Sequence, residues 1–133
     1  MIAFDSHVVV RLMVEDDEPQ VRRARRLLKE AAEREELVFI SDIVLCELEW
    51  VLGSAYGVPR RSILGAVRVL VADERYCFAD QKRVTMALTL YQDGKGDLAD
   101  YLLGLHGEDA GVGTTYTFDQ ELRDDARFTL VPR

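Results

Sequence analysis

The sequence predicts an α/β fold in which a mainly parallel sheet of four to five strands is covered by helices on both faces. Short apolar runs alternate along the chain with longer segments whose apolar residues recur at helical spacing. Gly and Pro residues separate several of these segments. Strands that alternate with helices form parallel sheets, because each crossover helix packs back on the sheet.

The N-terminal part supplies two strands and three helices. Residues 2–5 form a short apolar run that ends on an acid, and a helix with an apolar series over 8–13 follows. Residues 19–36 predict an amphipathic helix with one apolar face and one face of arginines and a lysine. Residues 37–40 predict the second strand, and Ser41 is the expected N-cap of a helix that extends to about residue 55.

The middle of the chain continues the alternation. Gly57 interrupts the preceding helix, and Pro59 suits the first turn of the next one. Residues 76–79 predict the third strand, after which Asp80 is the expected cap of a helix over 81–91.

The C-terminal part supplies the last strands. After Gly94 and Gly96, a helix is expected from Leu98 until Gly107 ends it. Residues 113–118 predict a Thr-rich fourth strand, and Asp119 is expected to open a short helix. Residues 128–131 predict a fifth strand at the edge of the sheet.

Length and composition favour one ordinary domain over residues 1–133. The chain is 48% hydrophobic and 31% charged with only three Pro, and no apolar stretch approaches the ~20 residues of a membrane span. Cys46 and Cys77 lack zinc-ligand or disulfide-framework spacing, so we expect buried thiols and a cytoplasmic protein. The net charge of -7 argues against nonspecific duplex binding, but a nucleic acid held through metal ions or a local basic face stays possible.

Carboxylates from four separate segments are expected at one edge of the sheet. Asp5 ends the first strand, Asp119 ends the fourth, and Asp97 and Asp100 open the helix before the fourth strand. Glu47 lies about a turn and a half into the helix after the second strand. In parallel α/β sheets, ligands bind beyond the carboxyl ends of the strands, where these acids lie.

Each acid also has a structural explanation. Asp5 and Asp119 could simply cap the helices that follow them, and the spacing of Asp97 and Asp100 is close to that of a capping box. Glu47 borders the apolar arc of its helix, which does not favour a solvated role, whereas Glu49 points elsewhere and is expected to be a surface acid.

Clustered carboxylates need a cation between them, because like charges repel and an unpaired buried charge is costly. No Lys or Arg lies beside these acids in the sequence. Mg²⁺ prefers carboxylate oxygens and keeps waters for phosphate contacts, so the pattern predicts metal-assisted hydrolysis of a phosphodiester.

Four sequence segments carry a resemblance to a known family. They are IAFDSH, SDIVLCELEWVL, GDLADYLL and TTYTFDQEL, in this order along the chain. Together they resemble the motifs of the PIN-domain family, specifically the VapC-type ribonuclease toxins of toxin–antitoxin pairs. The resemblance covers the whole chain.

The resemblance implies a three-layer α/β/α sandwich and endonucleolytic cleavage of RNA that depends on Mg²⁺ or Mn²⁺. It also implies a homodimer and a small cognate antitoxin that blocks the site. The acids that it places at the metal are Asp5, Glu47, Asp100 and Asp119. The supporting residues that it implies are Ser6, Asp97 and Thr117. His7 departs from the family, whose members more often have a small polar residue there.

Other residues and one other function stay open. The basic face of residues 22–29 is expected to be solvated rather than to bind phosphates. The spacing of Trp50, Tyr56 and Tyr76 does not distinguish stacking on bases from packing in the core or in a dimer. The alternative function is a noncatalytic α/β module, receiver-like or a degenerate nuclease, that binds Mg²⁺ or a partner at its acidic rim. A receiver is expected to have paired acids after its first strand, whereas Ser6 and His7 follow Asp5 here.

Overall fold

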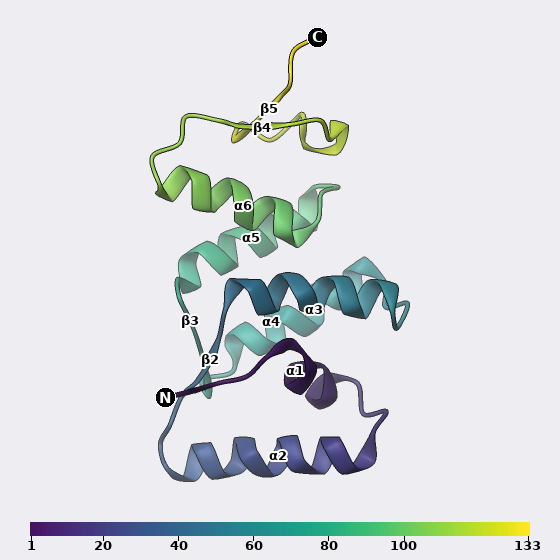
Figure 1. Ribbon diagram of the computed structural model, residues 1–133, viewed down its shortest axis with the longest axis vertical. Coiled ribbons are helices and arrows are strands. Elements are labelled where there is room, and N and C mark those ends of the chain that lie inside the picture. The colour runs from purple at the N-terminus through teal and green to yellow at the C-terminus, as the bar shows by residue number, and fades with distance from the viewer. The chain divides into compact units, whose positions relative to one another are not determined.

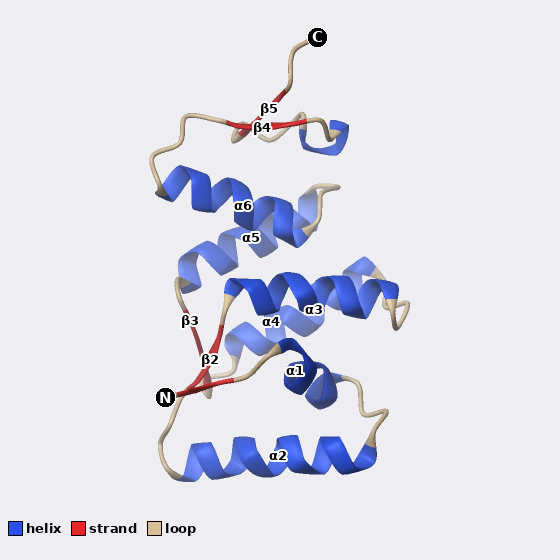
Figure 2. Ribbon diagram, in the orientation of Figure 1, coloured by secondary structure: helices blue, strands red, loops and turns tan.

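The computed structural model describes all 133 residues and confirms the α/β class. Six α-helices and one short 3₁₀ helix alternate with five strands, and every strand pair is parallel (Figure 2). The strands form a three-stranded and a two-stranded sheet. The chain divides into two compact units, Met1–Gln81 and Lys82–Arg133, and the expected single-domain organisation stays a prediction.

The sheet of the first unit has the order β1-β2-β3. Its strands are β1 (Ile2–Ala3), β2 (Val38–Ile40) and β3 (Tyr76–Phe78). The register pairs β2 with both neighbours, so β2 is the central strand. Val38 and Ile40 on β2, which point to the same face of the sheet, are completely buried, and Phe39 on the opposite face is half-buried.

Four helices pack around this sheet (Figure 1). They are α1 (Ser6–Met13), α2 (Glu18–Glu33), α3 (Asp42–Ser54) and α4 (Arg60–Ala72). Helix α1 contacts both α2 and α3, and α3 contacts α4. The expected cap at Ser41 is confirmed, because its Oγ accepts a hydrogen bond from the Val44 N–H at 3.2 Å. Helix α2 is shorter than expected at its C-terminus, where Glu35 adopts a left-handed backbone conformation (φ 58°).

The second unit begins with the helical pair α5 (Gln81–Asp93) and α6 (Leu98–Asp109). Strands β4 (Thr115–Thr117) and β5 (Phe128–Leu130) follow, with the 3₁₀ helix η1 (Gln120–Leu122) between them. The core of this unit includes Leu98, Leu102 and Phe128, which are at most 6% exposed.

The prediction that Gly107 ends α6 is wrong. The helix continues to Asp109, and the chain turns at Gly111, whose φ is 83°. A Cβ on Gly107 would lie 3.2 Å from the Thr115 Oγ1, and one on Gly104 would lie 2.9 Å from the Phe128 ring. These glycines therefore allow α6 to pack closely against the chain around β4 and β5.

The cysteines differ from the expectation of buried thiols. Cys46 and Cys77 are free, but both are only half-buried. No helix is long and apolar enough to cross a membrane.

Candidate functional site

Asp5 is the N-cap of α1. Its Oδ1 accepts a hydrogen bond from the Val8 N–H at 3.0 Å, which satisfies one of the open donors of the first helical turn. The side chain is 70% exposed, and its Oδ2 lies 3.9 Å from the Nδ1 of the exposed His7. The cap therefore fixes the direction of the carboxylate while Oδ2 faces solvent.

Ser6 connects this helix to the predicted acid on α3. It is the buried polar residue of the chain, 5% exposed, and its Oγ donates a hydrogen bond to Glu47 Oε2 at 3.1 Å. The structure thus brings together Ser6 and Glu47, which are 41 residues apart in the sequence. Ser6 directly follows Asp5.

The expected burial of the two α3 acids is reversed. Glu47 is exposed and Glu49 is half-buried. The fully buried stripe of α3 runs through Leu45, Leu48 and Leu52, so at 100° per residue Glu49 lies at its border and Glu47 lies outside it. Glu47 is therefore positioned by the Ser6 hydroxyl and not by burial.

Asp97 and Asp100 form the capping box that their spacing indicated. Asp100 Oδ2 accepts a hydrogen bond from the Asp97 N–H at 2.9 Å at the start of α6. Partial burial raises the pKa of the Asp100 carboxyl above its usual range, although the hydrogen bond from the Asp97 N–H opposes this. The negative charges of Asp97 and Asp119 raise it further, so these three acids of the second unit lie within electrostatic range of one another.

Thr117 and Asp119 together start the 3₁₀ helix. The Asp119 Oδ1 accepts a hydrogen bond from the Glu121 N–H at 2.9 Å, and the Thr117 Oγ1 accepts one from the Asp119 N–H at 3.0 Å. Thr117 was expected to have a supporting role. It acts on the backbone of Asp119, which in turn sets the direction of the carboxylate.

Three of the predicted acids share one arrangement. Asp5, Asp100 and Asp119 each engage one carboxylate oxygen with a backbone N–H, and the second oxygen accepts no hydrogen bond from the protein. Such oxygens are hard, oriented ligands of the type that Mg²⁺ binds. The chain does not gather three or more His, Cys, Asp or Glu side chains in a ready-made metal cluster, so the ligand set stays a prediction.

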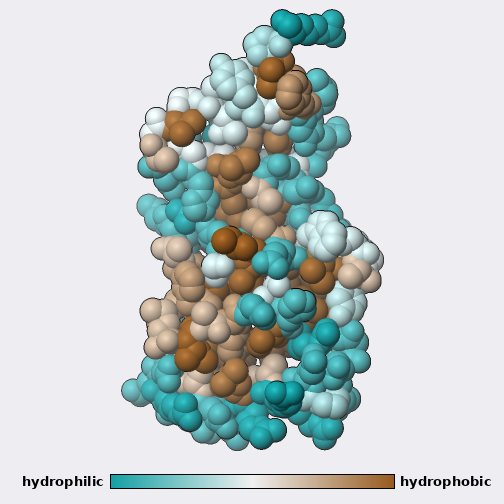
Figure 3. All heavy atoms as spheres, viewed as in Figure 1, coloured by the Kyte–Doolittle hydropathy of each residue, from teal (hydrophilic) through white to brown (hydrophobic).

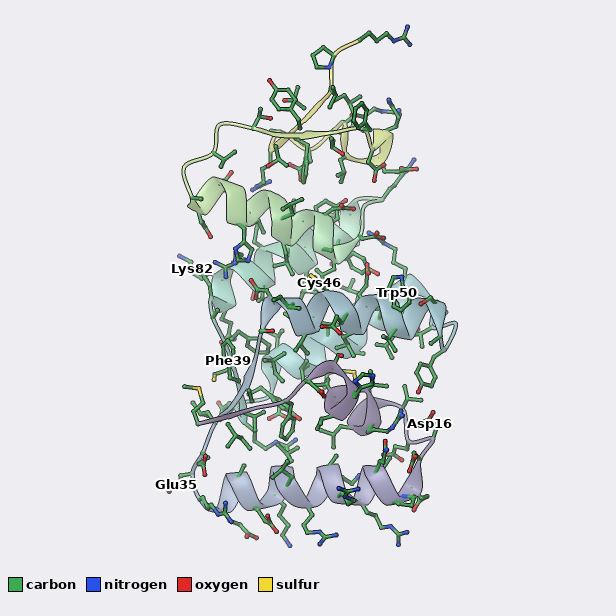
Figure 4. All side chains as sticks on the ribbon, viewed as in Figure 1. Asp16, Glu35, Phe39, Cys46, Trp50 and Lys82 are labelled. Carbon is green, nitrogen blue, oxygen red and sulfur yellow. The ribbon has the colours of Figure 1, made fainter.

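Sequence reasoning did not single out Arg11, which organises a network in the first unit. Its Nη1 donates to the Tyr56 hydroxyl at 3.1 Å and to Asp16 Oδ1 at 3.3 Å, and its Nε donates to Gln20 Oε1 at 2.6 Å. Tyr56 also donates to Asp16 Oδ2 at 2.9 Å, in the loop between α1 and α2 that Figure 4 marks with Asp16. The hydrogen bond with Tyr56 contributes most to the raised pKa of Arg11.

Two of the three aromatic residues singled out from the sequence have partners within the first unit. Tyr56 is held by its hydroxyl, and Tyr76 is 9% exposed and packs edge-on against Phe4 with ring centroids 6.5 Å apart. Trp50 on α3, labelled in Figure 4, is 68% exposed.

A cavity of about 390 Å³ lies beside Asp5 in the first unit. Its walls come from α1 with its cap and from α2, which pack against each other. The lining residues are Asp5, His7, Val8, Arg11, Gln20, Arg23, Ala24 and Leu27. A sequence signal for this wall existed, because Gln20, Arg23, Ala24 and Leu27 recur at the spacing of one helical face.

Most of the basic face of α2 is solvated, as expected. Arg22 pairs with Glu18, Arg25 with Glu15, and Lys29 with Glu33. The surface over α2 is correspondingly hydrophilic in the view of Figure 3.

Comparison with known proteins gives the family. The PIN domain family matches residues 2–127, a range that includes every acid discussed above. No curated protein matches the chain. PIN domains are in general metal-dependent nucleases, and PIN nucleases bind RNA. Because the match covers nearly the whole sequence, the chain belongs to the PIN domain family.

Proposed function

We propose that this PIN domain is an endoribonuclease that hydrolyses RNA phosphodiesters with Mg²⁺ or Mn²⁺ and acts as the toxin of a toxin–antitoxin pair. The observation that carries the proposal is the family match over residues 2–127 together with the presence of all four acids of the motifs. The proposed metal-binding and catalytic acids are Asp5, Glu47, Asp100 and Asp119.

The side chains of each unit support the proposed roles. The N-cap bond orients the Asp5 carboxylate, and the Ser6 hydroxyl holds Glu47. Burial and two neighbouring acids raise the pKa of Asp100, so its ionised form is destabilised, and a bound cation would offset this. A divalent metal, when bound, supplies a hydroxide near neutral pH and stabilises charge on the phosphate.

Cleavage of an end-labelled RNA tests the enzymatic proposal. Purified protein is expected to cut the RNA in Mg²⁺ or Mn²⁺ and to stop in EDTA. Asp100→Asn is expected to lose cleavage, whereas Asp124→Asn, which changes an exposed acid of the same unit, should keep it. Cleavage that persists in EDTA would contradict metal catalysis, and metal binding without cleavage would favour the noncatalytic module.

An apolar groove in the first unit supports the proposed antitoxin partner. It is an open groove of about 740 Å³ lined by α1, α2, α4 and the start of β3. Leu12, Met13 and Val69 contribute apolar lining, and Arg25 and Lys29 also line it. Such a groove fits the apolar face of an amphipathic helix. The proposed antitoxin would also lay an Arg on the acids of the site, in place of the metal.

Co-expression tests the toxin assignment. The protein should arrest growth, and a small protein encoded by the neighbouring open reading frame should restore growth and copurify. Val69→Asp, at a position that is 72% exposed, should stay toxic but lose the rescue. Light scattering measures the proposed homodimer. Absence of both toxicity and complex would remove the toxin assignment and leave a nuclease.

A further inference from the structure

The cavity between α1 and α2 has a donor whose direction is fixed. Arg11 carries only N–H donors, so the Gln20 atom that it contacts at 2.6 Å is the carbonyl oxygen. This is the hydrogen bond of the Gln20 side chain, and its Nε2 group has no hydrogen-bond partner in the protein. Gln20 lines the cavity, and because Asp16 and Tyr56 hold Arg11, the orientation of the Gln20 amide is set, with two N–H donors that no protein group accepts.

Arg23 is a second donor, one helical turn further along α2. It is exposed and takes part in no ion pair, in contrast to Arg22 and Arg25 on the same helix. It lines the same cavity as Asp5. Arg26 is also exposed and without an ion pair, but it does not line this cavity.

The remaining wall is apolar. Val8, Ala24 and Leu27 line the cavity, and Leu27 is 43% exposed. The volume of about 390 Å³ lies near the lower end of the ~300–1,000 Å³ of small-ligand sites. An apolar wall, a guanidinium and a fixed amide donor together match the face, the phosphate and the acceptor edge of one nucleotide.

We propose that this cavity binds the nucleotide next to the phosphodiester that is cleaved. Arg23 donates to its phosphate, and the Gln20 amide donates to its base. This inference rests on the proposed nuclease function, since Asp5, one of the proposed metal acids, forms the edge of the cavity. Because the Gln20 oxygen is already occupied, the site prefers guanine and uracil, which present carbonyl acceptors where adenine and cytosine present amino groups.

The first test compares two matched variants of the full chain. Cleavage of a short single-stranded RNA is measured in Mn²⁺ for the wild type, Arg23→Gln and Arg26→Gln. Loss of one charge-assisted phosphate contact should raise KM about tenfold in Arg23→Gln with kcat nearly unchanged. Arg26→Gln removes the same charge from the same helix and should keep KM within about twofold of the wild type.

The second test reads the base. Oligonucleotides that differ only at the nucleotide flanking the cleavage position are compared for the wild type and Gln20→Leu. The wild type should cut those with guanine or uracil faster, and the variant should lose this preference without losing its fold.

The outcomes separate this inference from the proposed function. If the wild type cleaves RNA but Arg23→Gln and Arg26→Gln change KM equally, or base preference survives in Gln20→Leu, the cavity inference is overturned and the nuclease stands. If the wild type neither binds nor cleaves RNA, both are overturned. If it binds without cleaving and only Arg23→Gln weakens binding in a fluorescence anisotropy titration, the proposed catalysis fails and the cavity is supported.

Discussion

Replacing Ser6 by Ala tests how Glu47 is held. The Ser6 hydroxyl is nearly inaccessible to water and donates to the Glu47 carboxylate at 3.1 Å. Hydrogen bonds to charged groups contribute ~1.5–3 kcal/mol, and the exposure of Glu47 reduces this through solvent screening. We therefore expect Ser6→Ala to lower the free energy of unfolding by about 1 kcal/mol.

The same substitution is expected to weaken the response to metal. Groups that orient a metal ligand typically change metal affinity by ~10–100-fold when removed. If Glu47 is a ligand, Ser6→Ala should require at least about tenfold more Mn²⁺ for half-maximal cleavage. The maximal rate at saturating Mn²⁺ should fall much less, because the carboxylate itself is still present.

A double-mutant cycle with Glu47→Ala separates positioning from general damage. Urea unfolding gives the stabilities, and the cost of Ser6→Ala should largely disappear in the Glu47→Ala background, because the acceptor is gone. A Ser6→Ala variant with the wild-type Mn²⁺ response, or with the same cost in both backgrounds, would refute the reasoning.

Three further substitutions follow from the structure. Asp100→Asn should abolish cleavage without loss of stability in urea unfolding at pH 7. Because the folded-state pKa of Asp100 is raised, the free energy of unfolding of the wild type should approach that of the variant as the pH falls through that pKa. Asp73→Asn should lower the free energy of unfolding by about 1 kcal/mol at pH 7, because the Arg75 guanidinium lowers the pKa of Asp73. The difference between variant and wild type should disappear as the pH falls below that pKa. Gly57→Ala should lower the free energy of unfolding by ~1–2 kcal/mol, since the φ of 63° strains any other L-residue although a Cβ there would meet no atom within 4 Å.

Local signals made the elements of the fold predictable. The N-caps at Asp5, Ser41 and Asp119 are set by interactions within three residues, which the sequence displays directly. The apolar runs of β2 and β3 also mark strands without knowledge of their neighbours. The α/β class follows from their alternation with helices.

The features that the sequence concealed depend on contacts between distant segments. Gly107 resembles a helix terminator, but the approach of Thr115 explains why a glycine lies inside α6. The border of the buried stripe on α3 depends on what packs against the helix. The sequence does not show this, so the expected burial of Glu47 and Glu49 was reversed. The spacing of Gln20, Arg23, Ala24 and Leu27 marks one face of α2, but the cavity beside that face depends on the contact of α2 with α1.

The sequence predicted which acids are candidates, but it did not predict how their side chains are held. The spacing of Asp97 and Asp100 predicts their capping box, and the structure adds that Asp119 lies close enough to raise the pKa of Asp100. Ser6 was assigned a supporting role through the resemblance alone. Its hydrogen bond to Glu47 supplies a physical reason for that role.

Helix capping and metal binding are compatible roles for the same aspartates. A carboxylate has two oxygens, and a cap uses one of them, as Oδ1 of Asp5 and of Asp119 shows. The hydrogen bond fixes the side chain, so the free oxygen points in a defined direction before any cation arrives. Asn keeps an oxygen for the cap but loses the charge, whereas Ala loses both. At each position, Asn should therefore keep the stability of the fold and Ala should lower it, whereas both should abolish cleavage. This pattern would show that one carboxylate performs the two roles.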